Sequence, residues 1–151
     1  MDLALFHINS NWFCGHKFEK LNGLFELDLS NNRIIEKFPS VIFRLMSLKF
    51  LNLRFNEFKG TVLKELFDKD LDAIFINNNR FVFDLPNNFG NLPVSIIVIT
   101  SNCFLGCIPS SISNMSRLKE ILLLNNGFSF CFRSKISRLK NSPSLTSAST
   151  S

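Results

Sequence analysis

The sequence predicts an α/β repeat solenoid of about six coils, because one short phrase recurs through the chain at nearly equal intervals. Each copy has leucine-like residues at its first, fourth and sixth places, asparagine at the ninth and usually phenylalanine at the eleventh. The asparagines are separated by 21, 24, 23, 23 and 24 residues, and they are Asn11, Asn32, Asn56, Asn79, Asn102 and Asn126. Five residue types kept in register through six copies are the signature of leucine-rich repeats.

Within each copy, the leucine-like residues alternate with other types, which is the period of a short strand. Equal coils that stack side by side then form a parallel sheet on the concave side. Pro39, Pro86 and Pro109 each lie seven residues after their asparagine, where proline fits an extended segment on the convex side. Residues 41–47 and 112–116 leave room there for one short helical or 3-10 turn each.

The repeated asparagine has a structural task in this scheme. Its amide can bond backbone groups at the sharp bend and in the adjoining coil, so that N–H and C=O groups buried at the bend stay satisfied. We therefore interpret the six asparagines as a structural ladder and not as a binding site.

The solenoid is expected to occupy residues 1–140. Residues 141–151 contain five serines and two threonines, a composition typical of a disordered tail. Neither end of the solenoid carries a polar capping coil, so we expect a partial, uncapped array.

Composition restricts the function. The chain has a formal net charge of +5, but residues 1–116 carry 11 basic and 11 acidic side chains, and the excess lies in residues 117–140. This distribution does not favour nucleic acid as a partner. The basic end could contact an acidic polymer such as pectin, or it could be a solvated edge. No run approaches the ~20 apolar residues of a membrane span, and the N-terminal residues do not resemble a signal peptide.

Two of the four cysteines, Cys107 and Cys131, each lie five residues after an asparagine of the ladder. Matching positions on neighbouring coils are close enough for a disulfide. The alternative is that both are free and buried as small hydrophobic residues. Cys14 and Cys103 fall at other places in the repeat, and with only two histidines the sequence predicts no metal site and no cofactor.

The outward-facing residues between the buried leucines form three columns on the concave face. They predict an apolar patch with acidic side chains beside it, and such patches mark protein or peptide binding more often than chance. The candidate ligand-binding residues are Glu26, Asp28, Phe50, Asn52, Phe75, Ile96, Val98 and Leu122. The alternative is that these positions became apolar through sequence drift and bind no ligand. No nucleophile lies beside a base, and an open sheet does not enclose a carboxylate pair, so we predict no enzymatic activity.

Several phrases carry a more specific resemblance. Glycine four residues and proline seven residues after the asparagine resemble the plant extracellular class of leucine-rich repeats. Residues 7–15 (HINSNWFCG), 24–33 (LFELDLSNNR), 66–75 (LFDKDLDAIF) and 106–109 (GCIP) resemble the repeat domain of the leucine-rich repeat extensins. The resemblance covers residues 2–140. The first interval is about three residues short, and Glu36, Leu63, Phe83 and Arg133 replace the glycine or proline of that pattern.

That resemblance implies a secreted, hydroxyproline-rich cell-wall glycoprotein whose repeat domain binds a basic, cysteine-rich signalling peptide, a rapid alkalinisation factor, in cell-wall formation. Two other hypotheses remain open. One is an inhibitor of a wall-degrading enzyme such as polygalacturonase, and the other is a truncated copy without independent function. Asn114 opens the sequence Asn-Met-Ser, a candidate glycosylation site on the convex side.

Overall fold

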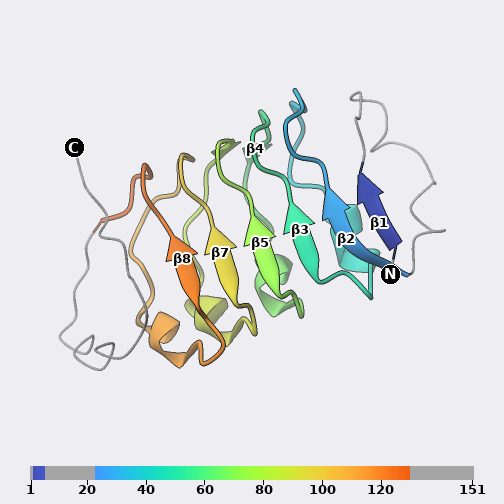
Figure 1. The fold of residues 1–151 in the computed structure, drawn as a ribbon. Helices are drawn as coiled ribbons and strands as arrows, with labels where there is room; N and C mark the ends of the chain where they lie inside the picture. Colours follow the sequence, from blue (N-terminus) through green and yellow to red (C-terminus); the bar gives the residue numbers. More distant parts are fainter. Residues whose placement is uncertain (1, 6–22, 130–151) are drawn as a thin grey trace.

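The computed structural model describes residues 2–5 and 23–129. Six short strands form one parallel sheet in the order β1–β2–β3–β5–β7–β8 (Figure 1). The strands are β1 (Asp2–Leu5), β2 (Leu24–Asp28), β3 (Phe50–Asn52), β5 (Ala73–Phe75), β7 (Ile96–Val98) and β8 (Glu120–Leu122). Apart from the β1–β2 pair, each strand meets the matching residues of the next coil without a shift. The predicted leucine-rich repeat solenoid with a parallel sheet is therefore confirmed.

Short 3-10 helices return the chain on the other side of four coils in the described part of the chain. They are η3 (Ser40–Arg44), η4 (Lys64–Asp68), η5 (Asn87–Asn91) and η6 (Ser110–Asn114). The sequence predicted η3 and η6 but not η4 and η5. Leu63, which stands where three other coils have proline, adopts φ −71° and ψ 134°, so the η4 turn begins in the same extended geometry without proline.

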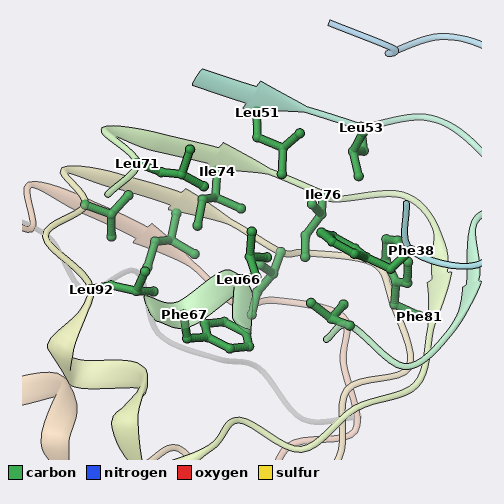
Figure 2. Close-up of a cluster of buried hydrophobic side chains, with 14 of the residues drawn as sticks. Phe38, Leu51, Leu53, Leu66, Phe67, Leu71, Ile74, Ile76, Phe81 and Leu92 are labelled. Atoms are coloured by element: carbon green, nitrogen blue, oxygen red, sulfur yellow. The ribbon is translucent and has the colours of Figure 1, made fainter. Parts of the chain in front are cut away.

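The core runs along the axis of the solenoid between the sheet and these turns. Figure 2 shows Leu51 of β3, Ile74 of β5 and Ile76, which follows β5, above Leu66 and Phe67 of η4. The phenylalanines at the eleventh place of four repeats add a row of buried rings, namely Phe58, Phe81, Phe104 and Phe128. The rings of Phe58 and Phe81 are nearly parallel, and their centroids are 5.9 Å apart. Most of the buried hydrophobic residues thus stand at places that recur once per coil.

Five of the six asparagines lie in the described residues, and a common pattern of cross-coil bonds is made by Asn56, Asn79, Asn102 and Asn126. Asn102 is representative, because its side-chain amide donates to the carbonyls of Ile76 at 3.0 Å and Ile99 at 3.2 Å, and its Oδ1 accepts the N–H of Phe81 at 3.1 Å. Each of these four therefore joins its own bend to the preceding coil. Asn11 lies outside the described residues, as do the tail at 141–151 and most of the first coil.

The residue before each of the five described ladder asparagines has a left-handed backbone. The φ angles lie between 53° and 56°, and the residues are Asn31, Phe55, Asn78, Ser101 and Asn125. Asparagine tolerates this region better than most residues, whereas a bulky ring there is strained. The bend is thus imposed by the coil even where the local residue disfavours it.

A second, smaller sheet follows the bend, and sequence reasoning missed it. Its strands are β4 (Lys59–Gly60) and β6 (Arg80–Phe81), and isolated bridges extend the pairing to other coils. Gly60 has φ +77° and Gly106 has φ +72°, a conformation that favours glycine. The register of this sheet is offset from the repeat. Lys37 lies five residues after Asn32, whereas its partner Lys59 lies only three residues after Asn56.

Candidate functional site

The sheet register brings the predicted concave columns together. Glu26 pairs with Phe50, Phe50 with Ala73, Ala73 with Ile96, and Ile96 with Glu120. The next column is Asp28, Asn52, Phe75, Val98 and Leu122. Adjacent strands are ~4.8 Å apart, so these side chains are immediate neighbours on one face.

The apolar members of these columns form one patch, which we call the concave patch. It consists of Phe50, Phe75, Ile96, Val98 and Leu122, all of which are partly exposed. The leucine-like residues between them in the strands are buried, as alternation along a strand requires. The ring of Phe50 lies 5.4 Å from that of Phe25, which supports one end of the patch.

Asn52 differs from its neighbours in these columns. Its side chain is 8% exposed, and its amide donates to Asp28 Oδ2 at 2.9 Å. Its own Oδ1 accepts the N–H of Arg54 at 3.3 Å. These contacts hold Asn52 and Asp28 in place, so Asn52 offers little surface to a ligand and acts mainly as a support for Asp28.

The third outward column adds a feature that the candidate list lacked. In the described residues it consists of Ser30, Arg54, Asn77, Thr100 and Leu124. The guanidinium carbon of Arg54 lies 5.9 Å from the centroid of the Phe75 ring, within the range of a cation–π contact. Arg54 Nε and Asn77 Oδ1 are buried without a hydrogen-bond partner in the described part of the chain. Because Arg54 stands at an outward position of its repeat, the sequence could have identified it as a residue of the concave face. Its stacking on Phe75 depends on the conformation of the side chain.

The described part of the three columns is acidic. It carries Glu26, Asp28 and Glu120 against the single cation Arg54. Within this part of the chain, neither Glu26 nor Glu120 takes part in an ion pair. The concave face therefore combines an apolar centre with uncompensated carboxylates at both ends.

Ion pairs lie at the edge of the sheet where the strands begin. Lys49 bonds the carboxylate of Asp70, and this hydrogen bond is the main reason that the pKa of Asp70 lies below its usual value. Lys69 donates to the carbonyl of Leu45 at 2.8 Å, and burial, followed by repulsion from Lys49, lowers its pKa. These groups stabilise the edge and leave the concave patch itself without a titrating side chain.

Cys107 is exposed and disulfide-bonded. The interpretation of Cys107 as a free, buried residue is therefore wrong. Cys131, its predicted partner, lies outside the described residues, so the pairing itself stays a prediction. Cys103 is free and exposed.

The described ranges 2–5 and 23–129 hold no group of three or more His, Cys, Asp or Glu side chains arranged to bind a metal ion. No helix in these ranges is long and apolar enough to cross a membrane. Asn114, the candidate glycosylation residue, is exposed at the end of η6, on the side away from the concave patch.

Comparisons with known proteins agree with this geometry. Residues 23–45 match the family model described as "Leucine Rich Repeat". Leucine-rich repeat extensin-like protein 4 of Arabidopsis thaliana is 64% identical over 123 residues, which are 80% of this chain and 25% of that protein. Leucine-rich repeat extensin-like protein 3 is also 64% identical over 80% of this chain and 16% of its own length. The chain thus spans a quarter or less of these relatives.

Two solved receptor structures have the same fold. The receptor kinase HAESA of Arabidopsis, solved with the peptide hormone IDA and a co-receptor, superposes with a TM-score of 0.68 at 25% identity. The match covers 75% of this chain and 19% of HAESA. A TDR receptor matches with a TM-score of 0.67 at 30% identity, over 74% of this chain and 20% of the receptor.

The same class of protein, a leucine-rich repeat solenoid, is indicated by the repeat phrases, the parallel sheets, the asparagine ladder and the relatives. The chain belongs to the leucine-rich repeat extensin-like family and corresponds to part of its repeat domain.

Proposed function

We propose that this chain is an extracellular, non-catalytic binding module of the plant cell wall, and that its concave patch binds a basic, cysteine-rich signalling peptide. The observation that carries the proposal is the register, which stacks five partly exposed apolar side chains from β3 to β8 into one surface. A contiguous apolar surface with a charged rim is typical of a protein or peptide interface.

The charge of the face favours a basic ligand. Glu26 and Glu120 lie at opposite ends of the same column, and neither is engaged by a cation in the described residues. A ligand with cationic side chains at both ends and apolar ones between them would satisfy this pattern. The solved complex of HAESA with a peptide hormone supports a peptide as the class of ligand.

Titration calorimetry with an oxidised basic peptide of the rapid alkalinisation factor type tests the proposal. Val98→Lys places a like charge at the centre of the concave patch, and we expect it to weaken binding at least tenfold. Val82→Lys is the matched control, because Val82 is 46% exposed and lies just after β6 of the smaller sheet. We expect the Val82 variant to bind like the unmodified chain.

The absence of saturable binding by the unmodified, folded chain would refute the proposal. Equal losses in the two valine variants would refute the concave location. Inhibition of polygalacturonase, abolished by Val98→Lys, would favour the alternative that the same face is an enzyme-inhibiting surface.

A further inference from the structure

A row of cations crosses the outer side of the second sheet. Lys37 pairs with Lys59 through an isolated bridge, and Lys59 pairs with Arg80 within the β4–β6 sheet. All three residues are exposed. Because paired residues of parallel strands point to the same side and lie ~4.8 Å apart, the three cationic side chains lie in one line along the axis of the solenoid. We call this line the lateral cation row.

The row is only partly neutralised. Within the described residues, Lys37 and Lys59 have no carboxylate at ion-pair distance. Arg80 Nη2 lies 2.7 Å from Glu57 Oε2, but the side chain of Arg80 is 66% exposed and keeps other N–H groups for a second acceptor. Glu36, which precedes Lys37, is also exposed and has no ion-pair partner in the described residues.

The row ends abruptly after Arg80. The next outward places on its coil are Val82 and Asp84, and Asp84 pairs with Leu105 of the following coil. The cations of the outer face thus lie over three coils, and beyond them the face presents the apolar Val82 and Leu105 and the acidic Asp84. The cationic part is a line of single charges.

We propose that the lateral cation row binds a linear polyuronate, an acidic polysaccharide that carries one carboxylate on each sugar. Such a polymer can lie along the axis of the solenoid and place one carboxylate near the cation of each coil. Two of the three cations are lysines, which act as point charges and do not require the paired geometry of an arginine–carboxylate fork. Contact by single charges predicts modest affinity that falls with salt.

This surface is separate from the concave patch, so the proposal does not depend on the proposed function. It also differs from the basic C-terminal residues that the sequence suggested for pectin, most of which lie outside the described residues. The row is built by the offset register of the second sheet, since Lys37, Lys59 and Arg80 stand at three different places in their repeats.

The test uses the full chain and purified oligogalacturonate at low ionic strength, measured by calorimetry. The variant combines Lys37→Gln, Lys59→Gln and Arg80→Gln. The control combines Arg44→Gln, Lys64→Gln and Lys119→Gln, which remove the same charge from other exposed positions. We expect the row variant to lose about tenfold or more in affinity and the control to lose less than about twofold. Circular dichroism checks that both variants fold.

Fully methyl-esterified oligogalacturonate should not bind, because it keeps the sugar chain but lacks the charge. Equal losses in the row variant and the control would overturn the proposal, since the binding would then follow net charge alone. Equal binding of polyglutamate, lost in the same row variant, would also overturn it by showing that the row accepts any polyanion. Unchanged binding after Val98→Lys is expected, because that residue lies on the concave patch.

Discussion

Replacing one asparagine of the ladder by alanine tests how much the cross-coil bonds contribute to stability. In Asn102→Ala, the N–H of Phe81 loses its acceptor at 3.1 Å in the core. The carbonyls of Ile76 and Ile99 each lose one donor, but each keeps the amide of a neighbouring ladder asparagine, at 3.2 Å from Asn79 and 3.0 Å from Asn126. The main cost is therefore one orphaned, buried N–H group.

Leaving a buried donor unsatisfied costs ~1 to 3 kcal/mol. We therefore expect Asn102→Ala to lower the free energy of unfolding by ~2 kcal/mol, measured by urea denaturation followed by circular dichroism. Asn87→Ala is the matched control, because Asn87 is exposed at the start of η5. Its effect should stay within ~0.5 kcal/mol. Equal denaturation midpoints for the two variants would refute the argument from the ladder.

A second substitution separates the acceptor from the donors. Asn102→Asp keeps an oxygen for the N–H of Phe81 but directs a negative oxygen at the carbonyls of Ile76 and Ile99. Burial beside carbonyl oxygens disfavours the charged form, so the pKa of the new carboxyl should be raised in the folded protein. The loss of stability should then be full above that folded pKa and shrink as the pH falls through it towards ~4. A loss that does not change with pH would show that the side chain turns away from the carbonyls.

The other predictions concern local geometry and cysteine chemistry. Phe55 has φ 54° and is 47% exposed, so Phe55→Asn should raise the free energy of unfolding by ~0.5 to 1 kcal/mol; a lower urea midpoint would contradict the strain argument. The pKa of Asp70 lies below its usual value chiefly through a lysine hydrogen bond, so its small stabilising effect should be present above pH ~4 and fade as the pH falls through the folded pKa; a carboxyl NMR titration with an ordinary midpoint would contradict it. Alkylation without reductant should label Cys103 and spare Cys107; peptide mapping should find Cys107 joined to Cys131, and any other partner would refute that pairing.

Much of the fold was predictable because each repeat carries the same pattern of buried residues and the same asparagine. A single Leu-x-Leu phrase cannot tell a strand from part of a helix, but six copies with a shared asparagine fix both the coil length and the side that faces the core. Asn79 and Asn102 could be assigned a structural role for the same reason, since a residue repeated at every bend is explained by the bend. The concave neighbours Phe50, Phe75 and Val98 followed from counting alone.

The second sheet could not be found in this way. Lys37, Lys59 and Arg80 occupy different places in their repeats, so no count along the chain predicts that they lie in one row. The burial of Asn52 was also hidden, because it depends on whether Asp28 in the preceding coil accepts its amide. The row arises from the offset register of the second sheet, which the leucine spacing does not set. The burial of Asn52 arises from a side-chain hydrogen bond within the regular register of the main sheet.

By itself, the sequence determined the solenoid, its concave order and the asparagine ladder, because these features depend on a period that a linear chain displays directly. Only the tertiary structure decided which outward residues remain open to a ligand, where Arg54 lies over Phe75, and which cations line up on the outer side. The physical reason is that stacking fixes the spacing between coils, while side-chain hydrogen bonds and the offset register of the second sheet decide what each coil presents to its neighbour.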